Sequence, residues 1–80
     1  MSKTFPLAMA VVGEPVRVES VNGGEKLIRR LTALGLTPGV NLSIVQDNGG
    51  PLLISVRDSR LALGRGMAQK VMVSVSENVD

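Results

Sequence analysis

Apolar and polar residues alternate along several short stretches of the chain, and this period of two is typical of half-buried β-strands. In the stretch GEPVRVESV, residues 13–21, Val16 and Val18 alternate with Arg17 and Glu19. Further alternating or short aliphatic runs follow along the chain. The pattern predicts five strands, at residues 13–21, 40–47, 52–58, 61–63 and 71–75. The inward-facing positions of the second and third strands are expected to be Val40, Leu42, Ile44, Leu52, Ile54 and Val56.

The period changes to that of a helix between residues 25 and 34. Leu27, Ile28, Leu31 and Leu34 fall on one helical face, and Glu25 places a negative charge in the first turn, where the helix dipole favours it. A helix of about ten residues is marginal by itself in water. We therefore expect its apolar face to pack against the rest of the protein.

The end of this helix carries the most specific local signals in the sequence. Gly35 can adopt the left-handed conformation that ends many helices, and Leu36 can then fold back onto Leu31 in a Schellman cap. Pro38 and Gly39 match the two central positions of a type II turn. The stretch therefore predicts a helix stop, with positive φ at Gly35, followed by a turn that directs the chain into the next strand.

Five short strands with one helix between the first and the second predict a mainly β protein, most simply a small closed β-barrel, because closure removes exposed sheet edges. An open α+β sandwich is the alternative. Eighty residues have room for one core, so we expect a single domain, residues 1–80, with its core at about 7–75. Connections are expected at the hairpin loop 48–51, the turn 58–60, and residues 64–70, as a tight turn or a single 3₁₀ turn.

Some outward positions of the predicted strands are apolar where polar residues are expected, namely Val45, Leu53 and Met72. One interpretation is that the N-terminal run LAMAVV, residues 7–12, folds over them as a lid. The other is an exposed patch that binds a partner. The sequence leaves both open. The run is too short for a secretory signal or a membrane span, so we expect a soluble, unprocessed protein.

The composition argues against several kinds of chemistry. Histidine, cysteine and tyrosine are absent, and the carboxylates are dispersed, so the sequence predicts no catalytic residues, no metal ligands, no bound cofactor and no enzyme activity. The net charge of +2 comes from scattered basic residues, whereas nucleic-acid binding usually recruits several clustered cations. A binding role fits this composition better than catalysis.

The ordered motifs of the chain resemble those of the FeoA family. The resemblance runs from about Leu7 to Val75 and rests on Leu7, Gly13, VRVESV, Gly24, RRLTALGLTPG, Gly50-Pro51 and LALGRGMAQKVMV. It implies a five-stranded SH3-like barrel with one main helix. It also implies a cytoplasmic accessory protein, without a cofactor of its own, for FeoB, a membrane ferrous-iron transporter with a GTP-binding domain. Self-association into a homo-oligomer stays open.

For this role the candidate partner-contacting residues combine exposed cations with apolar positions on the outer face: Arg29, Arg30, Leu53, Arg65 and Met72. The alternative function is a small nucleic-acid-binding barrel of the KOW or ribosomal type, because GEPVRV resembles the start of a KOW segment. Phe5 is the one aromatic residue in the sequence, and bases are usually bound by stacking on several aromatic side chains. Nucleic acid is therefore the less favoured partner.

Overall fold

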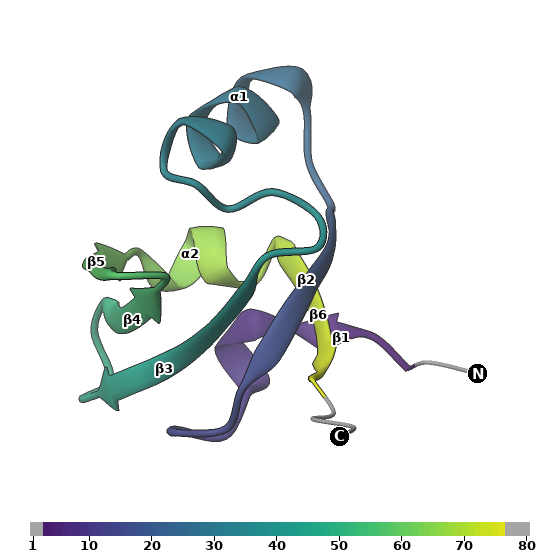
Figure 1. Cartoon of the computed structure of the whole chain (residues 1–80). Helices are drawn as coiled ribbons and strands as arrows, with labels where there is room; N and C mark the ends of the chain where they lie inside the picture. Colours follow the sequence, from purple (N-terminus) through teal and green to yellow (C-terminus); the bar gives the residue numbers. More distant parts are fainter. Residues whose placement is uncertain (1–2, 77–80) are drawn as a thin grey trace.

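A computed structural model describes residues 3–76, and in them one antiparallel sheet carries a short 3₁₀ helix and two α-helices (Figure 1). The strand order is β1-β6-β2-β3-β4-β5. The elements are β1 (Phe5–Pro6), η1 (Leu7–Met9), β2 (Val16–Val21), α1 (Glu25–Ala33), β3 (Asn41–Asp47), β4 (Leu52–Val56), β5 (Ser59–Leu63), α2 (Arg65–Ala68) and β6 (Val71–Val75). The prediction of a mainly β protein is confirmed. The predicted closure is incomplete, because β1 and β5 are the two ends of the sheet and do not pair with each other in the described chain.

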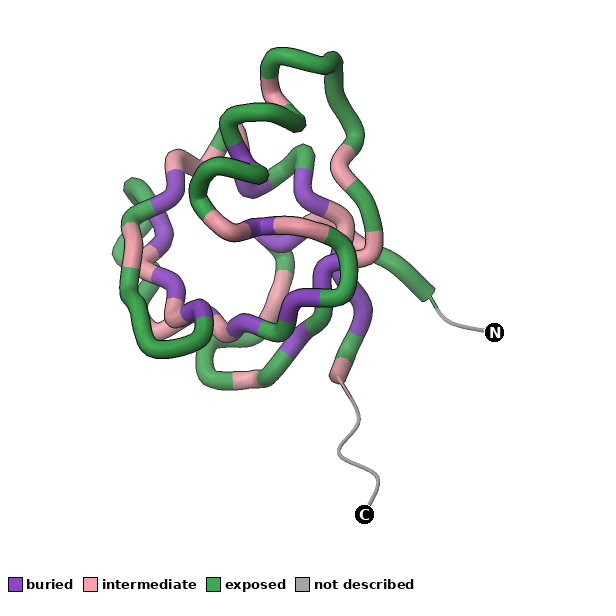
Figure 2. The backbone as a smooth tube through the Cα atoms, turned by 45° about the horizontal axis from the view of Figure 1, so that its top comes forward, coloured by how far each residue is buried: buried purple, intermediate pink, exposed green. Residues whose placement is uncertain are grey.

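The strands curl around an aliphatic core, and buried positions alternate with exposed ones around the resulting ring (Figure 2). All of the inward-facing positions predicted for β3 and β4 are buried. Leu7, Leu31, Leu36 and Leu63 add large buried side chains from outside the central strands. Because the core contains no aromatic residue, it is filled by branched aliphatic side chains that interdigitate closely.

The predicted number of strands and the position of the helix need correction. A sixth strand, β1, pairs with β6, with Phe5 opposite Val73 and Pro6 opposite Met72. Two residues are too few to show any alternation, and the strand forms because β6 offers it a free edge. The main helix α1 consequently follows β2 and precedes β3, rather than lying between the first two strands. The connection at residues 64–70 contains a single α-helical turn, α2, in place of a 3₁₀ turn.

The turn before β5 also differs from the prediction. Val56 pairs with Ser59, so a two-residue loop of Arg57 and Asp58 closes the hairpin and β5 begins at Ser59. Arg57 has a φ of 56°, and positive φ is a hallmark of the tight turns that match the twist of a hairpin. The sequence placed the turn at residues 58–60 because an arginine gives no signal for a positive φ.

Two β-bulges adjust which side chains face the core. The pairing of β2 with β6 shifts between Val18 and Ser20, which leaves Glu19 as the extra residue. The pairing of β3 with β4 shifts between Ile44 and Gln46, which leaves Val45 as the extra residue. A bulge places two residues opposite one and bends the strand. Val45, an apolar residue at a predicted outward position, therefore lies where the bulge interrupts the alternation of inward and outward side chains.

The predicted helix stop and turn are present in full. The Leu36 N–H donates to the Leu31 C=O and the Gly35 N–H to the Thr32 C=O, both at 2.9 Å, with a φ of 87° at Gly35. These two bonds define a Schellman cap. Gly39 has a φ of 94°, and the Val40 N–H closes the turn onto the Thr37 C=O at 3.1 Å, as a type II turn requires.

The apolar face of α1 is only partly buried, which contradicts the expectation that the whole face packs. Leu31 is fully buried and Leu27 is half-buried, but Ile28 is 43% exposed and Leu34 is 39% exposed. In Figure 1 the helix stands above one end of the barrel. A helix seated on the rim of a small barrel contacts it along a narrow stripe, so residues on the flanks of that stripe keep contact with water.

The N-terminal run does not form the complete lid that the sequence suggested. Leu7 is fully buried within the core, and Ala8 and Ala10 pack against it. Val11 and Val12, however, are exposed. The run therefore seals the barrel with its first residues, and its end adds apolar surface.

The helix stop provides a test of the local energetics. A Cβ added at Gly35 would meet no heavy atom within 4 Å, so Gly35→Ala should lose only the cost of the left-handed backbone, about 1–2 kcal/mol of unfolding free energy. Gly50→Ala is the matched control, because its added Cβ also meets nothing within 4 Å and its φ is not positive. Urea unfolding of both variants measures the difference. Equal midpoints for the two variants would contradict this account of the cap.

Candidate partner-binding surface

The predicted contact residues lie on four separate elements. Arg29 and Arg30 are exposed on α1, whereas Leu53 on β4 and Met72 on β6 are half-buried. Strands β2 and β3 lie between β6 and β4 in the sheet, so Leu53 and Met72 are not neighbours. Arg65 is on α2. The structure therefore distributes these five residues instead of gathering them into one patch.

Arg65 is held by an ion pair that ties α2 to the end of β3. Its guanidinium Nη2 contacts the Asp47 carboxylate, and about a third of each side chain is exposed. The Gly49 N–H also donates to the Asp47 carboxylate at 3.0 Å. This backbone hydrogen bond and the nearby Arg65 charge lower the pKa of Asp47 below its usual range. Arg65 thus fixes the turn at 47–49, and its charge is largely matched before any partner arrives.

The cations of α1 are more accessible to a binding partner than Arg65 is. Arg29 lies 3.5 Å from Glu25, one turn earlier, but both side chains are more than three-quarters exposed. Exposed pairs of this kind contribute little to stability. Lys26 and Arg30 make no ion pair with the carboxylates of residues 3–76. The helix therefore presents positive charge next to the exposed Ile28 and Leu34 side chains.

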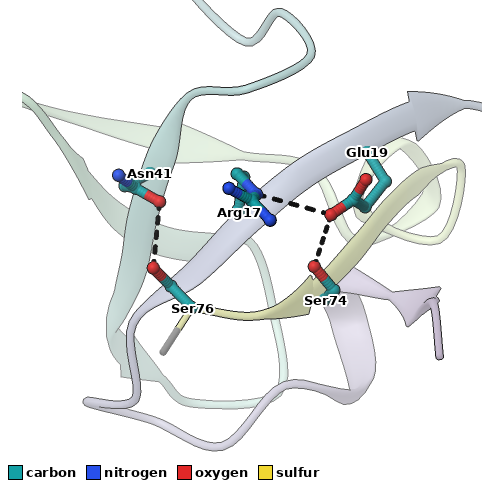
Figure 3. A network of polar contacts seen from close by, with 5 residues as sticks. All are labelled: Arg17, Glu19, Asn41, Ser74 and Ser76. Atoms are coloured by element: carbon teal, nitrogen blue, oxygen red, sulfur yellow. Dashed lines mark hydrogen bonds and ion pairs between the residues drawn. The ribbon is translucent and has the colours of Figure 1, made fainter. Parts of the chain in front are cut away.

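A polar network that the sequence did not indicate crosses the outer face of β2, β6 and β3 (Figure 3). The Ser74 hydroxyl donates to Glu19 Oε2 at 2.5 Å, and Arg17 Nε lies 3.5 Å from the same oxygen. Next to this pair, the Ser76 hydroxyl donates to Asn41 Oδ1 at 3.1 Å. The network depends on cross-strand pairing between distant segments, so no local sequence signal could have revealed it.

The hydrogen bond from Ser74 is the main cause of a lowered pKa at Glu19, and the charge of Arg17 acts in the same direction. Ser74 is buried, so its hydroxyl needs a partner within the protein. The bulge at Glu19 places the carboxylate where it can accept this bond. The network therefore stabilises the barrel wall.

Exposed apolar side chains occur mainly outside the strand positions that the sequence pattern indicated. Met9 is 73% exposed, and Val11, Val12 and Val75 are also exposed. The adjacent pair Val11-Val12 directly follows a helical turn that buries Leu7. In the sequence, the adjacent apolar residues Val11 and Val12 were the one available sign of this exposed surface. The lid interpretation had assigned them to the covering of the barrel instead.

Two kinds of feature, a cluster of metal-binding side chains and a membrane-spanning helix, are missing from the described part of the chain. Among residues 3–76, no three histidine, cysteine or acidic side chains lie together where they could hold a metal ion. In the same residues, no helix has both the length and the apolar character that crossing a lipid bilayer requires.

Residues 5–75 match the FeoA domain. The chain belongs to the FeoA family. The match covers all of the described strands and helices, so the family assignment applies to the whole barrel. The resemblance on which the sequence analysis relied is confirmed.

Known relatives of this FeoA-domain protein agree with the assignment. A protein of Methanocaldococcus jannaschii named "Putative Fe(2+) transport protein A" is 38% identical over 73 residues, which cover 91% of this chain and 89% of the relative. The crystal structure of an iron uptake regulatory protein, FeoA, matches with a TM-score of 0.81 and 35% identity, over 89% of this chain and 95% of that one.

A third relative links the family to the barrel type. The zinc complex of Stenotrophomonas maltophilia FeoA, described as an SH3 domain protein, matches with a TM-score of 0.76 and 31% identity. The match covers 86% of this chain and 88% of that one. This FeoA-domain protein therefore shares the SH3-like fold and belongs to a family connected with ferrous-iron transport.

The Glu19–Ser74 contact predicts a pH-dependent stability. The folded-state pKa of Glu19 lies below its ordinary value of 4.5, so the contribution of the carboxylate is complete above that pH and is lost as the pH falls through the lowered pKa. The melting temperature of the original protein should exceed that of Glu19→Gln at about pH 7, and the gap should close towards about pH 3.

Ser74→Ala is the control for this measurement. When the Ser74 hydroxyl is absent, the stability change caused by Glu19→Gln should depend much less on pH, because the main cause of the pKa shift is gone. A gap between the original protein and Glu19→Gln that stays constant from neutral to acid pH would contradict the assignment.

The sequence contains no imidazole or thiolate ligand, and this leads to a prediction about iron binding. The isolated protein should bind Fe(II) only weakly, because its seven acidic residues are dispersed along the chain. Anaerobic calorimetry near physiological ionic strength should give weak, non-saturating heats. A stoichiometric site tighter than roughly 10 μM would show that the fold or an oligomer assembles carboxylates that this reasoning did not anticipate.

Proposed function

We propose that this protein is a cytoplasmic accessory protein of a FeoB-type ferrous-iron transporter and acts through protein–protein contacts. The observation that carries the proposal is the FeoA-domain match over residues 5–75, together with 38% identity to a protein named for Fe(2+) transport. In this role the iron is the cargo of the transporter, and the barrel contributes a binding surface.

The chemistry available on the described surface supports contact with a protein. Exposed aliphatic side chains lie next to cations on α1, where Arg30 has no ion-pair partner among residues 3–76. Arginine and apolar side chains together are common in protein interfaces. Cations also increase the rate of association with an acidic partner. The five residues predicted from the sequence, Arg29, Arg30, Leu53, Arg65 and Met72, remain candidate contacts in this proposal.

The alternative of nucleic-acid binding has less support. Phe5, the one aromatic residue, is half-buried and packs against the core, so only part of its ring is accessible to a base, and stacking usually uses several aromatic side chains. Two of the basic residues, Arg17 and Arg65, are held in ion pairs with Glu19 and Asp47. Phosphate binding would require more free, clustered cations than this.

Direct binding to the transporter tests the proposal. The whole protein should bind the purified cytoplasmic GTP-binding domain of the FeoB-type transporter from the same cell in a saturable manner, as measured by calorimetry. Arg30→Glu should weaken binding about fivefold or more, because it reverses a free charge. Lys3→Glu, the same charge change at an exposed residue next to β1, should leave the affinity within about twofold.

Two results would contradict the proposal. One is an absence of binding to the GTP-binding domain at about 100 μM protein, which is weak even for a transient accessory complex. The other is salt-dependent binding to a structured RNA that is stronger than binding to the transporter domain, since this would favour the nucleic-acid alternative.

A further inference from the structure

The two edges of the sheet are protected to different extents. At one edge, β1 is only two residues long and contains Pro6, and both features hinder the addition of another strand. At the other edge, β5 runs from Ser59 to Leu63, and β4 is its one neighbour in the sheet of the described chain (Figure 1). The outer side of β5 is therefore the longer open edge.

The register of the hairpin shows which backbone groups lie on this open edge. The two-residue loop makes Val56 and Ser59 a hydrogen-bonded pair, and bonded and non-bonded pairs then alternate along the hairpin. Leu61 and Leu63 point their backbone groups towards β4. Arg60 and Ala62 point theirs outwards, and no backbone hydrogen bond outside the sheet pairing uses them within residues 3–76. The edge thus offers two N–H groups and two C=O groups.

The side chains beside these groups leave the edge accessible. Arg60 and Ala62 are both exposed, whereas Leu61 and Leu63 face the core. Ala62 is opposite Leu53 on β4, and Leu53 is half-buried on the outer face. A strand added next to β5 would therefore meet a guanidinium at one position and a small apolar surface two residues further along.

Charge decides which kind of strand fits. Arg60 forms no ion pair with any carboxylate in the described chain, and Arg57 in the adjacent turn is also exposed without one. Arginine on an edge opposes pairing with a second copy, because it would bring like charges together. The same arginine favours an incoming strand that carries a carboxylate opposite it.

We propose that the outer edge of β5 binds an extended, acidic segment of a partner protein as an additional strand. The segment carries a carboxylate for Arg60 and, two residues away on the same face, an apolar side chain that covers Ala62 and Leu53. Backbone hydrogen bonds to Arg60 and Ala62 supply affinity, and these two side-chain contacts supply specificity. Binding of an acidic strand to β5 does not depend on the proposed function. The choice of the transporter domain as the partner rests on that function.

Ala62→Pro tests the backbone contribution directly. Proline is tolerated on an edge strand where the N–H faces outwards. The β4–β5 hairpin should therefore stay intact, with the Leu61 and Leu63 amides still protected from exchange with solvent. The variant removes one edge donor and places the proline ring where the partner carbonyl would lie. Ala62→Thr is the matched control, because it keeps the N–H. For the charge, Arg60→Glu is the test variant, and Arg60→Lys is its control because it keeps the positive charge.

The first measurement uses the peptide acetyl-Ser-Glu-Thr-Val-Thr-amide and amide-resolved NMR of the whole protein. At about 5 mM peptide, the largest shifts should be at the Arg60 and Ala62 amides, and acetyl-Ser-Lys-Thr-Val-Thr-amide should cause much smaller ones. The proposal is overturned if these amides do not respond, if both peptides act equally, or if β5 pairs with a second copy in a concentration-dependent dimer.

The second measurement uses the cytoplasmic GTP-binding domain of the FeoB-type transporter. Ala62→Pro and Arg60→Glu should each weaken binding about tenfold or more. Ala62→Thr and Arg60→Lys should stay within about threefold, and Lys3→Glu within about twofold as before. Unchanged binding by the first two variants overturns the β5 proposal and leaves the proposed function intact. A peptide response without transporter binding supports the edge and contradicts the proposed function.

Discussion

The connection between α1 and β3 is the constraint on which the rest of the structure depends. The Schellman bond from the Leu36 N–H to the Leu31 C=O brings two fully buried leucines together. The turn that follows is fixed to β2, because the Gly39 N–H donates to the Val18 C=O at 2.7 Å and the Val18 N–H donates to the Val40 C=O at 2.9 Å. Helix, turn and two strands are therefore positioned by one short segment, and β3 enters the barrel in a single register.

With the core filled by aliphatic side chains, the polar groups of this protein act on the outside. Glu19 accepts from Ser74 across the barrel wall, and Asp47 joins Arg65 to the turn at Gly49. These contacts use charged side chains to fix the surface. A barrel held together in this way has a stable surface. Among residues 3–76, the surface groups that remain open include the cations of α1, several apolar side chains and the edge of β5.

Much of the architecture was predictable because it depends on local patterns. The alternation in β3 and β4 identified every inward residue, and Gly35 and Gly39 identified the cap and the turn, since few other residues adopt a positive φ at low cost. The candidate contact residues stay a prediction, because their arrangement depends on more than local patterns. Leu53 and Met72 both face outwards, but strand order separates them, and Arg65 is already paired with Asp47. Strand order and ion pairing are properties of distant segments.

The sequence by itself determined the location of the central strands, the helix and its end, and the aliphatic nature of the core, because these follow from side-chain period, glycine conformation and composition. Only the tertiary structure decided that Phe5 and Pro6 form a strand, that Glu19 and Val45 are bulges, and that Arg60 and Ala62 have open backbone groups. Each of these features is defined by its partner strand. The physical reason is that a hydrogen-bond register exists only between two segments, and neither segment encodes it alone.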